Sequence, residues 1–155
     1  MAQTFTATAA QTFGTTGFFQ SPPKTIEKGY IIRATTLSLS FSATVSAVLQ
    51  MVPVPKGCQV HDVILYWDFA GSADMYTLHV GDSLNVKRYI SSASCSGSGV
   101  VRMGGGGSSI AGGMGYSYSA ENVVQVKVSA LSGAAAVSGS IRLAVMYSMD
   151  NNEKG

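Results

Sequence analysis

Apolar and polar residues alternate with a period of two over much of the chain beyond residue 28, which is the pattern of half-buried β-strands. The alternation is clearest at 124–128, where three valines alternate with Gln125 and Lys127, and at 141–147, which closes the pattern. Turn signals recur every 8–12 residues and no amphipathic helix pattern is visible, which predicts an all-β antiparallel sandwich or barrel of roughly eight strands. The strand segments that this pattern predicts are 29–36, 45–54, 60–69, 75–80, 86–90, 99–103, 115–119, 124–128 and 141–147.

The most apolar segment is 60–69, with the sequence VHDVILYWDF. Its apolar residues fall on both faces of a strand, which predicts a central strand covered on both sides. Pro53 and Pro55 end the strand before it, because proline cannot donate a hydrogen bond to a β-ladder. Eight strands connected as two Greek keys would form a jelly roll, so we expect an antiparallel jelly-roll β-sandwich.

Three regions are expected along the chain: an extended N-terminal arm at 1–28, the sandwich at 29–149 and a short tail at 150–155. The first 23 residues carry no charge and end at a Pro-Pro pair. Exposed phenylalanines are unfavourable in water, yet their burial alone does not offset the entropy of ordering some twenty residues. We therefore expect the arm to bind a neighbouring subunit or partner as an added strand on a sheet edge, with a disordered tail as the alternative. The arm residues expected to contact the partner are Phe5, Phe13, Phe18 and Phe19.

Charge is sparse in this chain of 155 residues. Charged residues make up 12%, against about 25% in ordinary domains, and the net charge is +2. This balance disfavours a nucleic-acid partner that is bound by phosphate neutralisation. No apolar stretch of about 20 residues is present, so no membrane helix is expected, and the uncharged start is unlike a secretory signal. Cys58 and Cys95 are expected to be thiols, although a single bridge between them stays open.

The sequence predicts no catalytic residue, no metal site and no cofactor, and the chain is not expected to be an enzyme. The glycine tract at 104–107 lacks the lysine of a phosphate-binding loop, so the Gly/Ser-rich stretch 91–115 is expected to be a long surface loop. His61 and His79 match no zinc spacing, and no GxSxG motif marks a serine as activated. Tyr66 and Trp67 could stack on a sugar, but in so apolar a strand Trp67 is expected in the core.

The segment 80–90 (VGDSLNVKRYI) predicts a hairpin that turns at Gly81-Asp82. Lys87, Arg88 and Tyr89 follow the turn. Two interpretations stay open: an exposed basic tip with no partner, or an electrostatic contact with an acidic partner. In the second case these three residues bind that partner.

Three segments resemble small structural proteins of tailed bacteriophages, namely the head decoration or cement proteins with a jelly-roll fold. They are MVPVPKGCQVHDVILYWD (51–68), YTLHVGDSLNVKRYI (76–90) and SAENVVQVKV (119–128). The resemblance covers residues 29–148. It implies a viral structural protein that is assembled in the host cytoplasm, binds the major capsid protein on the outside of the head and stabilises the shell. It also implies a homo-oligomer, a dimer or trimer, because a symmetry axis of a shell presents one site several times.

Two other functions remain as alternatives. One is a phage tail, fibre or baseplate adhesin that binds a host glycan through exposed aromatic residues. The other is a small hydrolase or lectin-like jelly roll, which would require a clustered histidine and carboxylate site.

Overall fold

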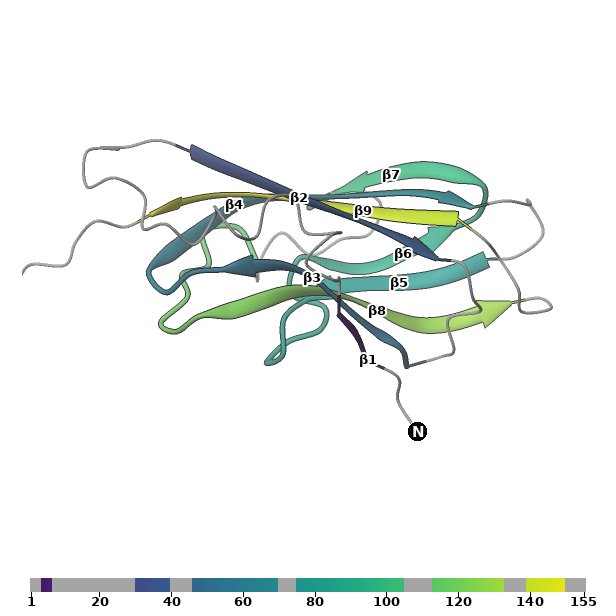
Figure 1. The fold of residues 1–155 in the computed structure, drawn as a ribbon, viewed down its shortest axis with the longest axis horizontal. Coiled ribbons are helices and arrows are strands. Elements are labelled where there is room, and N and C mark those ends of the chain that lie inside the picture. Colours follow the sequence, from purple (N-terminus) through teal and green to yellow (C-terminus); the bar gives the residue numbers. More distant parts are fainter. Residues whose placement is uncertain are drawn as a thin grey trace, which may run out of the picture.

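Two β-sheets packed face to face form the body of the protein (Figure 1). The computed structural model describes residues 4–6, 30–39, 46–69, 75–104, 113–132 and 139–149. The strands in the described residues are β1 (Thr4–Thr6), β2 (Tyr30–Leu39), β3 (Val48–Val54), β4 (Cys58–Phe69), β5 (Met75–Gly81), β6 (Ile90–Cys95), β7 (Ser98–Arg102), β8 (Asn122–Ser132) and β9 (Gly139–Met149). One sheet has the order β1-β3-β8-β5-β6 and the other has the order β2-β9-β4-β7. The predicted all-β sandwich is therefore confirmed.

The core lies between the sheets and is built by the alternation that the sequence showed. On β9 the residues Ile141, Leu143, Val145 and Tyr147 are at most 1% exposed, and Arg142 between them is exposed. On β8 the three valines at 124, 126 and 128 are buried in the same way. Burial of such side chains contributes about 1.5–3 kcal/mol each, and this burial is the main source of stability of the sandwich.

The strand β4 lies inside its sheet, between β9 and β7, but only one of its faces is fully buried. Leu65 points into the core, while Tyr66 on the opposite face is 39% exposed. The prediction that both faces of this strand are covered is therefore wrong. A β-bulge between Val60 and Asp62 inserts one residue and reverses the alternation, so the apolar run divides between two faces.

Two predicted strands are loops in the structure, and one predicted loop contains strands. Residues 86–89 belong to a turn that precedes β6, and 115–119 makes only an isolated bridge between Ser117 and Gln59. The stretch 91–115 instead contains most of β6 and all of β7. Ser and Gly have low strand propensity, but pairing with β5 and β4 outweighs it. Residues 105–112 of that stretch lie outside the described residues.

Without β1, the strands divide four and four, as β2-β9-β4-β7 and β3-β8-β5-β6. Successive strands lie in opposite sheets except for β5 and β6. This order is compatible with the two Greek keys of a jelly roll, and the jelly roll stays our prediction for the connectivity.

Little of the expected arm lies within the described residues. Residues 4–6 form β1, which pairs in parallel with β3 at the edge of its sheet, with Phe5 opposite Leu49. Phe13, Phe18 and Phe19 lie outside the described residues, as do the tail at 150–155 and residues 7–29 before the sandwich. We expected the arm to add a strand to a neighbouring subunit or partner, whereas residues 4–6 add to the chain's own sheet, and binding of the arm to a partner stays a prediction.

Candidate partner-binding loop

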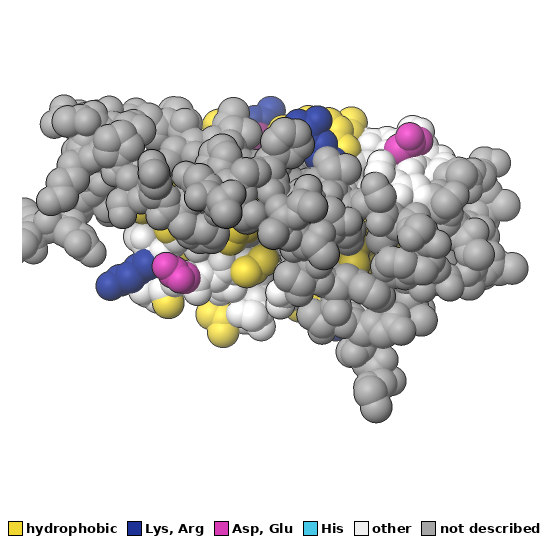
Figure 2. All heavy atoms as spheres, in the orientation of Figure 1, with side chains coloured by type: hydrophobic (Ala, Val, Ile, Leu, Met, Phe, Trp, Pro, Cys, Tyr) yellow, Lys and Arg dark blue, Asp and Glu magenta, His cyan; other side chains and the backbone are white. Residues whose placement is uncertain are grey.

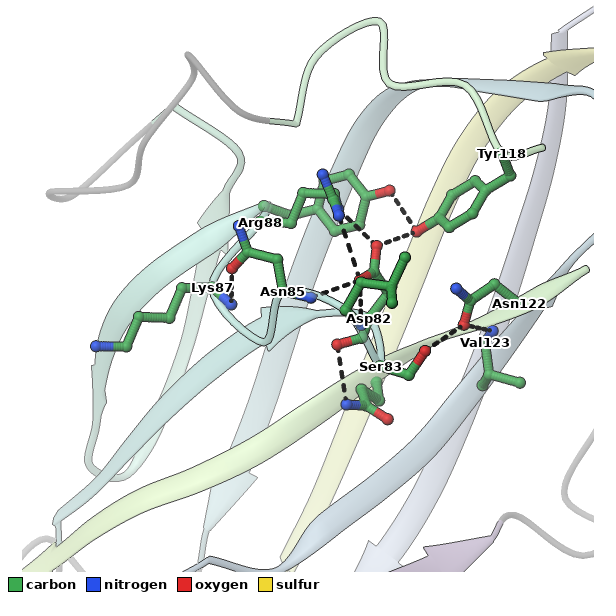
Figure 3. Close-up of polar contacts among 11 residues, drawn as sticks. Asp82, Ser83, Asn85, Lys87, Arg88, Tyr118, Asn122 and Val123 are labelled. Carbon is green, nitrogen blue, oxygen red and sulfur yellow. Dashed lines mark hydrogen bonds and ion pairs between the residues drawn. The ribbon is translucent and has the colours of Figure 1, made fainter. Parts of the chain in front are cut away.

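A tight loop between β5 and β6, residues 82–89, carries the densest set of polar contacts on the described part of the chain; we call it the Asp82 loop (Figure 3). The side chain of Asp82 folds it locally, because its Oδ1 accepts hydrogen bonds from the backbone N of Leu84 (2.9 Å) and of Asn85 (2.8 Å). Asn85 makes the same kind of contact, since its Oδ1 accepts a hydrogen bond from the backbone N of Lys87 (3.0 Å). An Asp or Asn side chain that bonds to the backbone two or three residues ahead is a standard way to fix a turn.

Gly81 is required at the start of the loop because the backbone returns very close to it. A Cβ at this position would lie 2.0 Å from the carbonyl O of Asn85 and 2.5 Å from the carbonyl carbon of Val86. Both neighbours are backbone atoms, so a side chain could be accommodated only by moving the loop.

The carboxylate of Asp82 is fully buried and is neutralised by Arg88 from the end of the same loop. The Nε of Arg88 donates to the Oδ2 of Asp82 at 2.6 Å, and Nη2 lies 3.5 Å from Oδ1. The guanidinium also stacks on the ring of Tyr116, with its carbon 3.6 Å from the ring centroid. A buried charge is tolerated only when it is paired and hydrogen-bonded, and both conditions hold here.

A second segment, residues 113–118, holds the loop from outside the hairpin. The hydroxyl of Tyr118 donates to the Oδ2 of Asp82 at 2.9 Å and lies 2.7 Å from the hydroxyl of Tyr89. Figure 3 shows Arg88 and Tyr118 converging on Asp82 from two sides. Gly113 packs so closely that an added Cβ would lie 2.7 Å from the carbonyl O of Arg88. The loop is thus fixed by contacts 36 residues apart in the sequence.

The pKa values of the cluster follow from this packing. Burial alone would raise the pKa of Asp82, but the hydrogen bonds from Arg88, the Asn85 backbone and Tyr118 outweigh it and the pKa is lowered. Burial alone would lower the pKa of Arg88, yet its bond to Asp82 raises it. Burial is the main cause that raises the pKa of Tyr89 and of Tyr118. The pair therefore stays ionised and both phenols stay protonated at neutral pH, so this cluster is an anchor for the backbone.

The outer side of the Asp82 loop exposes an apolar side chain beside a basic one. Leu84 is 78% exposed, the highest value among the large apolar residues of the described chain. Ser83, Asn85 and Lys87 are also exposed, and in Figure 3 the side chain of Lys87 extends away from the cluster. Met114, on the segment that packs against the loop, is 59% exposed.

The three residues expected to bind a partner at the hairpin have different places in the structure. Lys87 is exposed, the Arg88 side chain is 12% exposed and paired with Asp82, and Tyr89 is fully buried. A partner contact at this hairpin is therefore available to Lys87 but not to Tyr89. Arg88 turns inward to its ion pair with Asp82, and the backbone N–H of Tyr89 donates to the carbonyl O of Val80 at 2.9 Å.

The two histidines that the sequence singled out have different surroundings. His61 lies 2.7 Å from the hydroxyl of Ser148, and the pKa of His79 is lowered by burial and by nearby Lys87. Within the described ranges, no three His, Cys, Asp or Glu side chains come together as a metal site would require. Cys58 and Cys95 are buried and are not bridged to each other, and burial raises the pKa of the Cys95 thiol to about 12.

Tyr66 and Trp67 do not form one aromatic platform. Trp67 packs against the core and lies under Gly99, where an added Cβ would be 2.3 Å from its ring. Tyr66 faces outward, with Val100 opposite it on β7 and the guanidinium carbon of Arg142 5.7 Å from its ring. In Figure 2, basic side chains lie beside apolar ones at the top of the view, where Figure 1 has β7.

Among the residues that the structure describes, no helix has the length and apolar character that crossing a membrane requires.

Comparison with known proteins gives matches in structure only. No protein-family model matches the sequence, and no curated protein matches it. The fold is similar to a chain of the capsid of Ralstonia phage GP4, with a TM-score of 0.63 and 17% identity over 96% of this chain and 99% of that one. It is also similar to a chain of the Cyanophage Pam1 capsid asymmetric unit, with a TM-score of 0.59 and 19% identity over 84% of this chain and 91% of that one. At these identities the matches establish a shared fold over nearly the whole chain.

Proposed function

We propose that this chain is a structural protein of a phage particle that binds the outside of the head and stabilises the shell. The observation that carries the proposal is the fold similarity over 96% of the chain to a chain from a phage capsid. The chemistry of the Asp82 loop supports it, because the acidic, basic and phenolic groups of that cluster hold one another in place. A protein whose buried polar groups fix a loop is suited to binding by shape.

The partner in this proposal is the major capsid protein, and the protein acts as a dimer or trimer. A symmetric oligomer places identical surfaces over identical shell subunits. Linking two or three weak contacts in one oligomer raises occupancy through effective concentration, without any single tight site. A network of such bridges on the virion surface opposes the outward pressure of the packaged genome.

The arm at 1–28 is proposed as a further contact, made by adding a strand to a neighbouring subunit. The edge of β3 that pairs with residues 4–6 is the acceptor that the structure offers. A parallel pair of three residues contributes few hydrogen bonds, so exchanging it between neighbouring copies costs little.

The adhesin alternative needs an exposed aromatic platform for a glycan. The two adjacent aromatic residues of β4 face opposite sides of their sheet, so they supply no such platform. We therefore retain the capsid role.

Heating isolated phage heads that lack the protein, with and without the purified chain, tests this function. Bound protein is expected to raise the rupture temperature, read as dye access to the DNA. A chain lacking residues 1–28 is expected to give a smaller rise, and its circular dichroism shows whether the sandwich is intact. Equal rupture temperatures with and without the full chain would contradict the proposal.

A further inference from the structure

We infer that the Asp82 loop is a preformed docking tip, which inserts Leu84 into an apolar recess bordered by carboxylates on the shell protein. We define the docking tip as residues 83–87 together with Met114. The inference rests on the proposed function, and it assigns the contact to residues outside the arm.

The backbone of the tip is fixed before any partner binds. Two backbone N–H groups at the tip, those of Leu84 and Asn85, bond to a carboxylate that is itself 0% exposed. Gly113 and the ring of Tyr116 press on Arg88 from the neighbouring segment. A rigid tip loses little conformational entropy on binding, which favours affinity from a small contact.

The ion pair of the loop lies on its inner side, and Leu84 lies on its outer side. Burying the Asp82 carboxylate is costly, and a hairpin can turn without it. The loop nevertheless folds the Asp82–Arg88 ion pair inward and leaves Leu84 outward, at 78% exposure. Four large apolar residues are exposed on the described surface, and two of them, Leu84 and Met114, lie on the two segments that pack together here.

The exposed charge of the tip indicates the chemistry of the partner. Within the Asp82 loop the charge of Asp82 is cancelled by Arg88, so the exposed Lys87 gives the tip its net positive charge. A matching surface therefore has an apolar recess for Leu84 and a carboxylate within reach of Lys87. Single exposed apolar residues are common on protein surfaces, and the rigid support together with the adjacent charge distinguishes this one.

The test compares surface variants in binding to purified phage heads, measured as co-sedimentation over a range of protein concentrations. Leu84→Ser is expected to raise the dissociation constant about 10- to 100-fold, because it removes the aliphatic side chain that binding would bury. Lys87→Gln is expected to weaken binding a few-fold at low salt and less at high salt, because salt screens an exposed charge. Val100→Ser is the matched control, since Val100 is also apolar and 58% exposed but lies on the outer face of β7.

The outcomes separate this inference from the proposed function. If the unmodified protein binds and Leu84→Ser binds equally well, the docking tip is wrong while the capsid role stands. If Leu84→Ser and Val100→Ser weaken head binding equally, the inference is also overturned, because binding would then be non-specific hydrophobic adsorption. If the unmodified protein does not bind heads at all, both the inference and the proposed function fail. Circular dichroism confirms that each variant is folded before it is compared.

Discussion

Replacing Asp82 with asparagine is expected to lower the free energy of unfolding by about 3–5 kcal/mol. Asparagine keeps the shape and an acceptor for the backbone N–H groups of Leu84 and Asn85, but it removes the negative charge. The guanidinium of Arg88, with 12% of its side chain exposed, would then be a buried charge without a counterion. Urea denaturation monitored by circular dichroism measures the difference.

Asp68→Asn is the control for this change. Asp68 is exposed and accepts a hydrogen bond from Ser98 at 2.6 Å, so the same substitution there is expected to alter stability by no more than about 0.5 kcal/mol. The double variant Asp82→Asn with Arg88→Met is expected to recover part of the loss, because it removes the unpaired charge. Equal effects of the two single asparagine substitutions would show that the Asp82 ion pair contributes nothing.

The change in the free energy of unfolding caused by Asp82→Asn is expected to depend on pH, because the pKa of the Asp82 carboxyl is lowered in the folded state. A group whose pKa is lower in the folded state stabilises the fold fully above its unfolded pKa, which is about 3.9 for aspartate. That contribution is lost as the pH falls through the lower, folded value. The stability difference between the unmodified protein and the variant is therefore expected to be largest near pH 7 and to shrink below about pH 4.

Replacing a buried leucine and an exposed leucine with alanine is expected to distinguish an effect on stability from an effect on binding. Leu143→Ala removes a side chain that is 0% exposed and lies opposite Leu65 between the sheets, so stability is expected to fall by about 2–5 kcal/mol. Leu84→Ala removes a side chain that is 78% exposed and is expected to change stability by no more than about 0.5 kcal/mol. Thermal unfolding and head binding are measured for both variants.

Only the exposed leucine is expected to matter for binding once each variant is folded. Below its unfolding temperature, Leu143→Ala is expected to bind heads like the unmodified protein, while Leu84→Ala binds more weakly. The opposite pattern would mean that Leu84 supports the fold and that the docking tip has been misassigned.

Elements with local, regular patterns could be predicted from the sequence, and elements fixed by distant contacts could not. The alternation from Ile141 to Tyr147 gives one buried face, and β9 has that face. Residues 86–90 have a strand-like composition, but Asp82 bonds to the backbone ahead of it and to Tyr118, so most of this segment becomes a turn. The bulge in β4 likewise depends on pairing with β9, which composition alone does not show.

The partner-binding site at the hairpin stays a prediction, but the structure shows which of its three residues are accessible. The pattern of basic residues pointed to 87–89, where only Lys87 proved to be exposed among the three. Asp and Asn favour turns because their side chains bond to the backbone just ahead, so Asp82 and Asn85 could have indicated a turn in place of a strand at 86–90. Nothing in the local sequence indicates the contribution of Tyr118, which comes from 36 residues away.

A cryo-electron microscopy map of the intact particle, combined with counting of the chain per particle, decides whether this chain covers the phage head. We expect many copies at regular sites on the outer surface of the head, with residues 83–87 against the shell protein. A few copies confined to the tail or its fibres, with none on the head, would contradict this expectation.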